Sequence, residues 1–415
     1  MCSVRQGLRM AYAFFLVCSF AVMPPLGAQT SAGAHWVGSW AASQQLPEPQ
    51  NSLAPESLRD STLREVVHLS LGGGTLRVRL SNAFGTAPLH LFSVHIARPI
   101  LPSAGKIDPA TDRALSFSGS GDVTIPAGAD YVSDAIEYPV AALSDLAISI
   151  HYDVPPVQQT GHPGSRATSY VAVGDKTAAA DLPLATRVEH WYQLSEVDVI
   201  SPAESIVVLG DSITDGHGAT VDQNNRWTDV LAQRLNRASG STGVLNEGIG
   251  GNHLLTDGLG PNALARFDRD VLAPSAAGYL IVLEGVNDLG GLTRDGPASA
   301  ADHDALVHRM IAAYSQIIVR ARARGIKVIG ATILPYTGSD YYHPGPESEA
   351  DRQKVNFWIR GAGHFDAVVD FDKIMSDPQR PDHLLAAFDS GDHLHPSPAG
   401  YGAMGEAVPL MFFSH

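Results

Sequence analysis

Five short apolar runs alternate with helical patterns after about Ser201, and this alternation constrains the fold more than any other feature of the 415-residue chain. The clearest helical pattern spans Asp302–Arg324, and Gly325 ends it. Near-continuous apolar strands alternating with helices are typical of a parallel sheet covered on both faces. We therefore expect an α/β domain over residues 201–415, with its last helix starting near Pro398. The five strand-like runs are 205–209, 243–246, 279–284, 326–333 and 367–371.

Residues 29–200 follow a different period. Leu76–Leu80 and Leu146–Tyr152 alternate apolar and polar residues, and turn clusters such as Gly72–Gly74 separate such stretches. Short strands at this spacing predict a β-rich N-terminal domain, an antiparallel sandwich or jelly roll, without a clear helix. Trp36 and Trp40 lie four apart in a predicted strand, so we expect them on one side of it, as core residues or as a ligand platform.

Residues 1–28 are typical of a signal peptide. Arg5 and Arg9 precede an apolar stretch, and Pro24–Ala28 supplies a small-residue exit. We expect cleavage near Ala28 and an exported protein, secreted or periplasmic, with no stable membrane insertion after cleavage; an N-terminal membrane anchor is the alternative. Both cysteines, Cys2 and Cys18, fall in this segment, so the mature chain is expected to have neither a disulfide nor a thiolate metal site.

The charge balance argues against one class of partner. The chain has 43 acidic and 28 basic residues, a formal net charge of −15. Because nucleic-acid binding needs a basic face, we expect no nucleic acid as partner. The composition, 44% hydrophobic and 17% charged, is that of a soluble globular protein and favours no particular oligomeric state.

Four short blocks carry the chemistry. Gly210-Asp211-Ser212 follows an apolar run, and open α/β sheets place reactive groups at the carboxyl ends of such strands. Alone, this tripeptide is better explained as a simple turn. Three further blocks follow in order: Asn246–Asn252, Gly285–Asp288 and Asp392–Pro396. Their order makes a composite catalytic site the better hypothesis.

Each block supplies one part of a hydrolytic site. Ser212 is the candidate nucleophile, and its hydroxyl needs a base, for which His395 is the candidate. Asp392, three residues earlier, can turn back to orient that imidazole. The backbone N–H groups of Ser212 and Gly251 and the amide of Asn287 can then form an oxyanion hole. Structural roles stay open for Gly251, as a turn glycine, and for Asn287, as a helix N-cap or turn residue.

A metal site is the competing chemistry. Asp392, His393 and His395 are potential zinc ligands, but the chain has no HExxH helix and no cysteine outside the leader. We expect neither a metal nor an organic cofactor.

The four blocks together resemble the GDSL-type lipases and esterases, the SGNH hydrolases, over residues 203–412. The resemblance implies a flavodoxin-like α/β/α fold, Ser212 as nucleophile, Gly251 and Asn287 in the oxyanion hole, and Asp392 and His395 as the Asp-x-x-His pair. It also implies that no cofactor is needed. Ile213 stands where many members have leucine.

Three further stretches resemble a secreted subgroup near the xylan esterases: Asn225–Trp227, Gly258–Pro261 and Ala265–Asp270. The leading prediction is therefore a secreted serine esterase that removes short acyl groups, above all acetyl, from plant polysaccharide. A general arylesterase or lysophospholipase is one alternative, and a non-catalytic glycan-binding protein is another. In a candidate substrate loop, Tyr336, Tyr341 and Tyr342 are predicted to stack on sugar rings, or else to pack internally.

Overall fold

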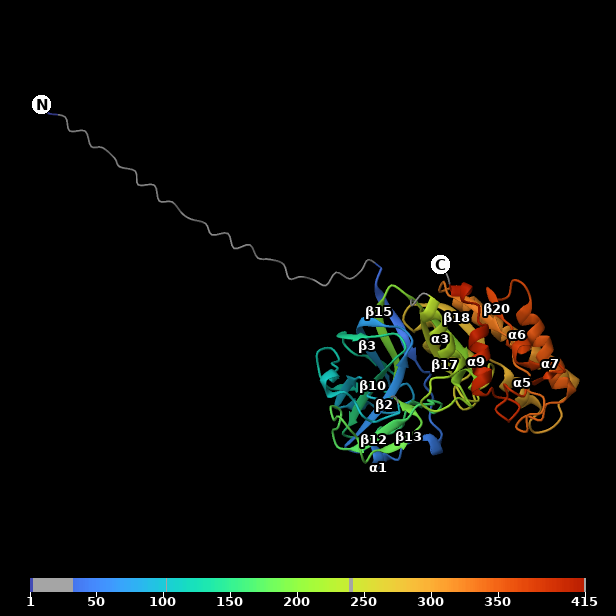
Figure 1. The fold of residues 1–415 in the computed structure, drawn as a ribbon, viewed down its shortest axis with the longest axis horizontal. Coiled ribbons are helices and arrows are strands. Elements are labelled where there is room, and N and C mark those ends of the chain that lie inside the picture. The colour runs from blue at the N-terminus through green and yellow to red at the C-terminus, as the bar shows by residue number, and fades with distance from the viewer. Residues whose placement is uncertain (3–32, 102, 239–241, 414–415) are drawn as a thin grey trace. The chain divides into compact units, whose positions relative to one another are not determined.

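A five-stranded parallel sheet is the framework of the second half of the chain in this computed structural model, which describes residues 1–2, 33–101, 103–238 and 242–413 (Figure 1). The strand order is β17-β16-β18-β19-β20, and every neighbouring pair is parallel. In chain order this is 2-1-3-4-5, the flavodoxin-like arrangement. The predicted α/β class is confirmed. The strands are β16 (Glu204–Gly210), β17 (Thr242–Gly248), β18 (Ala277–Leu283), β19 (Lys327–Ala331) and β20 (Ala367–Val369).

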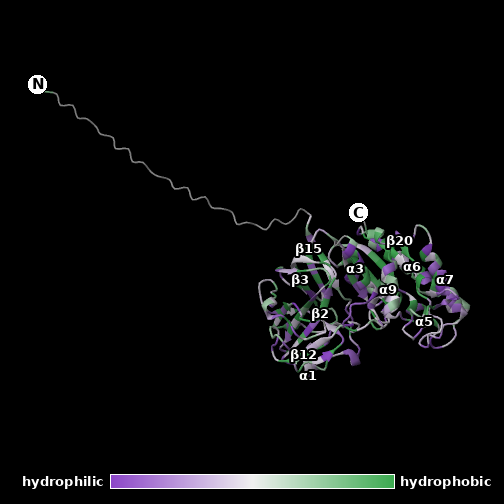
Figure 2. Cartoon of the chain, viewed as in Figure 1, coloured by the Kyte–Doolittle hydropathy of each residue, from purple (hydrophilic) through white to green (hydrophobic). Residues whose placement is uncertain are grey.

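Two groups of helices pack with this sheet. α3 contacts β17 and α9, whereas α6 and α7 contact each other and β19. The first group is α2 (Ser212–Asp215), α3 (Trp227–Ala238), α8 (Phe371–Met375) and α9 (Pro398–Ala407), and the second is α4 (Ala263–Phe267), α5 (Val286–Thr293), α6 (Ala300–Arg322) and α7 (Pro346–Arg360). Helices on both sides explain why the strands are apolar throughout, with Ile206–Leu209 fully buried. The outer helix α7 is largely hydrophilic in Figure 2.

The predicted helix boundaries lie close to the observed ones. α6 begins after Ser299, which forms a capping box with Asp302. α9 begins at Pro398, and Ser397 caps it by accepting the N–H of Gly400. Local capping chemistry therefore sets both starts.

Two antiparallel sheets make up most of residues 33–203. Their facing side chains form one hydrophobic core, which includes Leu76 and Val197 from one sheet and Leu63 and Ile148 from the other. The first sheet holds β1 (His35–Ala41), β15 (Leu194–Ser201), β3 (Gly73–Ser81), β8 (Asp130–Val132) and β9 (Ile136–Val140). The second holds β13 (Thr186–Val188), β12 (Ser169–Val173), β2 (Ser61–Leu69), β10 (Ser144–Tyr152), β5 (Ser93–Ala97) and β6 (Arg113–Ala114). This agrees with the expected all-β N-terminal region.

Short elements complete the β-rich half. Two small pairs are β4 (Leu89–Leu91) with β7 (Val123–Ile125) and β11 (Gly161–His162) with β14 (Trp191–Tyr192). The sequence did not indicate α1 (Pro55–Leu58), a single turn that opens with proline.

The prediction that Trp36 and Trp40 face the same side is wrong. A β-bulge between Gly38 and Trp40 inserts one residue in β1 and reverses the alternation. Trp40 points into the core, with its ring 4.9 Å from that of Trp191. Trp36 lies on the other side, where the guanidinium of Arg77 sits 4.4 Å above its ring. Trp40 is therefore a core residue.

Residues from Gly33 onward form one unit by their contacts. The predicted domain boundary at residue 200 stays a prediction, although β15 ends at Ser201 and β16 begins at Glu204. The predicted signal segment lies, apart from its first two residues, outside the described ranges. Among the residues that are described, no helix is long and apolar enough to cross a membrane.

Candidate active site

Ser212 lies at the carboxyl end of the central strand β16 and is the first residue of α2. Asp211 caps this turn by accepting the N–H of Ile213 at 2.9 Å. A side chain at Gly210 would place its Cβ 2.1 Å from the hydroxyl oxygen of Thr214, so only glycine allows the tight strand-to-helix turn. The Gly-Asp-Ser block is therefore both a turn and the support of a serine at the edge of the sheet.

A continuous chain of hydrogen bonds joins Ser212, His395 and Asp392. Ser212 Oγ is 2.8 Å from His395 Nε2, and His395 Nδ1 is 2.6 Å from Asp392 Oδ2. With its hydrogen on Nδ1 facing the carboxylate, the imidazole presents the Nε2 lone pair to the serine hydroxyl. This is the arrangement that lets an imidazole take a proton from serine.

The Asp392 carboxylate is fixed by its own loop. Its Oδ1 accepts the backbone N–H groups of Leu394, at 3.0 Å, and of His395, at 2.8 Å. Burial opposes ionisation of Asp392, but the hydrogen bonds and the charge of His395 prevail and hold the pKa of this carboxyl well below its usual range. Asp392 is therefore an anion at neutral pH and can stabilise a protonated His395.

Gly251 and Asn287 line the same cavity as Ser212, Asp392 and His395, a space of about 820 Å³. Gly251 has a φ of +66°, a conformation that favours glycine. Asn287 is the second residue of α5 and not its N-cap, which is Gly285. The structure thus brings all five predicted residues to one cavity. It also shows that Asn287 is not a helix N-cap.

The Asn287 amide is oriented from two sides. Its Nδ2 donates to the carbonyl of Asn252 at 2.6 Å, and its Oδ1 accepts the hydroxyl of Tyr342. An amide nitrogen carries two hydrogens, so one remains to point at a bound oxyanion. Asp288 holds the adjoining loop by accepting the N–H groups of Leu254, at 2.7 Å, and Leu255, at 3.0 Å.

Arg266 supports the site from beneath and was not predicted to have a role. Its guanidinium is fully buried and donates to the Gly210 carbonyl at 2.9 Å and to Asn252 Oδ1 at 3.0 Å. It therefore connects the Ser212 turn to the loop that carries Gly251.

The other stretches that resemble the xylan-esterase subgroup are mostly structural. Arg226 and Trp227, in the stretch Asn225–Trp227, are buried framework residues. Of these stretches, only Gly258 and Leu259 line the cavity.

The three predicted substrate-binding tyrosines differ in position. Tyr341 is 53% exposed and lines the cavity, with the Arg294 guanidinium 4.2 Å above its ring. Tyr342 lines the cavity but is buried, and its hydroxyl donates to Asn287 Oδ1. The prediction for Tyr336 is wrong, because this side chain is only 1% exposed and packs in the core of the α/β half.

The competing metal site lacks one of its predicted ligands. His393 turns outward, with its Nδ1 2.6 Å from Asp389. His217, which the sequence did not suggest, instead joins Asp392 and His395, with ligand atoms within 4.8 Å of one another. A metal there would compete for His395, whose two ring nitrogens are engaged by Ser212 and Asp392.

His217 also touches the catalytic candidates directly. Its ring centroid is 4.1 Å from that of His395. The side chain is exposed at the cavity, yet the surrounding protein partly desolvates its ring. This desolvation, with the nearby charges of His395 and Arg166, lowers the pKa of His217 to about 4. It is therefore neutral at pH 7.

Comparison with known proteins places this geometry in a class. Residues 208–403 match the GDSL-like lipase/acylhydrolase family. This part of the chain is a GDSL-type acylhydrolase domain, and the protein is an ester hydrolase. No curated protein matches the chain.

Several solved structures are similar to about half of the chain. A lipolytic protein of the G-D-S-L family from Desulfitobacterium hafniense is 24% identical, with a TM-score of 0.37 over 49% of this chain and 97% of that one. A lipase/acylhydrolase from Enterococcus faecalis is 22% identical, with a TM-score of 0.37 over 49% and 93%. An acetyl xylan esterase from Geobacillus stearothermophilus is 18% identical, with a TM-score of 0.37 over 51% and 94%. At these TM-scores the likeness carries no information on the substrate.

Proposed function

We propose that the protein is an exported serine esterase that hydrolyses short-chain acyl esters, above all acetyl esters, on carbohydrate. The observation that carries the proposal is the hydrogen-bond chain from Ser212 through His395 to Asp392 at the wall of an open cavity. Export is part of the proposal and rests on the signal-like residues 1–28.

The reaction proceeds in two acyl transfers. His395 Nε2 takes the proton of Ser212 as Oγ attacks the ester carbonyl, and Asp392 stabilises the resulting imidazolium. The N–H groups of Ser212 and Gly251 and the free hydrogen of Asn287 bind the oxyanion. His395 then gives its proton to the leaving alkoxide, which departs as alcohol. Water, activated by the same imidazole, attacks the acyl-serine and releases the acid.

Carbohydrate as the alcohol part is supported by the cavity mouth. The exposed Tyr341 ring, held under Arg294, offers a flat apolar face to a sugar ring. Leu259, 52% exposed, lines the same cavity, and the exposed Asp340 adds a carboxylate that can bind hydroxyls.

One observation favours the arylesterase or lysophospholipase alternative. A second cavity of about 610 Å³ shares His253, Asn287 and Gly291 with the first. Its other lining residues are mainly apolar and include Leu255, Leu264, Leu292 and Leu306. A long acyl chain or an aryl group could extend from the oxyanion site into it.

The first test compares wild type with Ser212→Ala on p-nitrophenyl acetate. We expect a folded variant without turnover; activity within tenfold of wild type would overturn the proposal. A glycan-binding protein would bind xylan yet hydrolyse no ester in either form.

The substrate test compares acetylated xylan, p-nitrophenyl esters of increasing chain length and lysophospholipid. Ala312→Phe serves as a matched variant, because exposed Ala312 lines only the second cavity. Under the leading proposal this variant keeps wild-type activity on acetyl esters, and acetylated xylan is the better substrate. A preference for long chains that Ala312→Phe removes would establish the alternative.

A further inference from the structure

A histidine of the β-rich half is hydrogen-bonded to the helix that begins with Ser212. His162 lies on β11, in the first half of the chain, and its Nε2 is 3.0 Å from Oδ1 of Asp215. Asp215 is the last residue of α2, three positions after Ser212. Both side chains are almost fully buried, with 4% and 3% exposed. We infer that His162 is a positioning residue, which holds the α2 turn, and with it Ser212, in the geometry for attack.

The helix needs such support because it is short. Four residues form too little helix to be stable without outside contacts. The parallel sheet supplies one, since Asn246 Nδ2 on β17 donates to the Thr214 carbonyl at 2.7 Å. His162 supplies a further contact, from the first half of the sequence.

Both nitrogens of the His162 ring have hydrogen-bond partners. Its Nδ1 lies 2.8 Å from the carbonyl of Ser43, which can only accept, so this nitrogen carries a hydrogen. Nε2 faces a carboxylate, which requires a second hydrogen between the two groups. Burial opposes ionisation of Asp215, but the charge and hydrogen bond of His162, with Arg166 and Arg226, outweigh it and lower the pKa of Asp215. The contact therefore joins the His162 ring to a buried carboxylate at hydrogen-bond distance.

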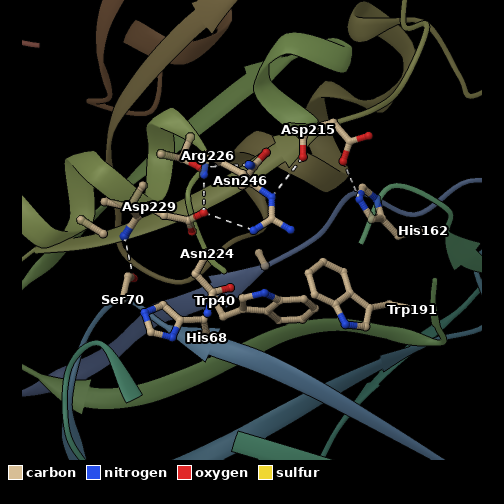
Figure 3. A pocket seen from close by; sticks show the side chains of 14 residues that line it. Trp40, His68, Ser70, His162, Trp191, Asp215, Asn224, Arg226, Asp229 and Asn246 are labelled. Carbon is tan, nitrogen blue, oxygen red and sulfur yellow. Dashed lines mark hydrogen bonds and ion pairs between the residues drawn. The ribbon is translucent and has the colours of Figure 1, made fainter. Parts of the chain in front are cut away.

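The segment that carries His162 is itself fixed against the α/β half, and Figure 3 shows His162 and Arg226 both bonded to Asp215. Arg226 donates through Nη2 to the Ser165 carbonyl and through Nε to the Asp215 carbonyl, the latter at 3.1 Å. A Cβ at Gly164 would lie 1.9 Å from Oδ2 of Asp215, so glycine is needed for the backbone to approach. A buried polar contact with all its partners in place holds two such segments in one fixed arrangement.

This inference rests on the proposed function, with Ser212 as the attacking group. The test uses the full chain and measures kcat, KM, melting temperature and the rate at which a fluorophosphonate modifies Ser212. For His162→Gln we expect kcat and the modification rate to fall together by about 10–100-fold, since misplacement of a reacting group has effects of this size. KM should change little.

Asp215→Asn, which is isosteric, should show a similar loss, and the double variant should lose no more than either single one. If His162→Gln does not fold, Asp215→Asn alone provides the test. The matched control is His95→Gln, which removes another histidine–aspartate contact of the β-rich half, 3.0 Å to Asp112, without touching α2. It should keep wild-type kcat.

Two failures are distinguishable. If His162→Gln melts at a lower temperature but keeps kcat and the modification rate per folded molecule, His162 is merely structural and the inference is overturned. If the reagent modifies wild type no faster than Ser212→Ala, the proposed function itself fails.

Discussion

The Tyr342 hydroxyl donates to Oδ1 of Asn287 at 2.5 Å, so a residue between β19 and α7 orients the amide at the start of α5. The phenol is buried, and burial raises the pKa of Tyr342 above its ordinary value, so it remains a donor at neutral and mildly alkaline pH. With Oδ1 engaged by Tyr342 and one Nδ2 hydrogen by Asn252, the remaining hydrogen has a fixed direction. An oxyanion donor fixed in advance needs no reorganisation during the reaction.

Tyr342→Phe should lower kcat about tenfold, since the loss of one hydrogen bond of this kind amounts to roughly 1.4 kcal/mol. KM should stay near wild type. The matched control is Tyr152→Phe, which removes a similar 2.6 Å bond from a buried tyrosine to Gln193 in the β-rich half. Steady-state kinetics on p-nitrophenyl acetate would contradict the role of Tyr342 if both variants behaved alike.

Asn287→Ala should lower kcat by about 10²–10³ with a small change in KM, because the oxyanion exists only in the transition state and the tetrahedral intermediate. The melting temperature of the same preparation must be measured too, because Asn287 also bonds Asn252 and Tyr342. A large melting shift with an unchanged kcat per folded molecule would assign Asn287 a structural role only.

His395→Ala should abolish turnover, whereas His393→Ala should remain within a few-fold of wild type. The two histidines are two residues apart, yet only His395 bonds Ser212, while His393 bonds Asp389 at the surface. Measured kcat/KM values in the reverse order would mean that the base has been misassigned.

The sequence predicts which residues meet in one cavity where short motifs carry them. Ser212, Gly251, Asn287 and the Asp392–His395 pair each follow a recognisable strand or loop signal, and the strand order brings them together. Tyr336 could not be told from Tyr341, because adjacent turn residues in one loop carry no period that predicts which is buried.

The supporting residues could not be predicted, and the reason is physical. Arg266 and His162 act through tertiary contacts between segments distant in sequence, and a buried charge has no local signature. The bulge that turns Trp40 away from Trp36 likewise depends on pairing between β1 and β15. Only the folded chain specifies such partners.

Arg266→Met should lower the free energy of unfolding by about 3–5 kcal/mol, because it breaks a buried ion pair with Asp270 and removes the donor of several buried acceptors. Arg266 lies 3.0 Å from Asp270 and 3.3 Å from Glu284, all three buried. The control is Arg322→Met, which removes a surface pair with Asp366 and should change stability by only about 0–1 kcal/mol. Urea unfolding of both variants measures the difference, and equal midpoints would contradict the prediction.

Asp211 and Asp392 should give opposite pH dependences of the free energy of unfolding. Burial, with the nearby Asp288 and Asp215 charges, raises the pKa of Asp211 to about 7 from an ordinary 3.8. The folded state therefore binds more protons than the unfolded state between these values, and the contribution of Asp211 to stability is lost as pH rises through about 7. Asp211→Asn keeps the helix cap and removes this loss, so the variant should gain stability relative to wild type between pH 5 and 8.

Asp392, whose pKa is lowered, contributes stability above its unfolded pKa that is lost as pH falls. Asp392→Asn should accordingly lose stability relative to wild type as pH rises from about 3 to 5. Melting temperatures across pH 3–8 measure both, and curves parallel to wild type for Asp211→Asn would show that Asp211 is already ionised in the folded protein.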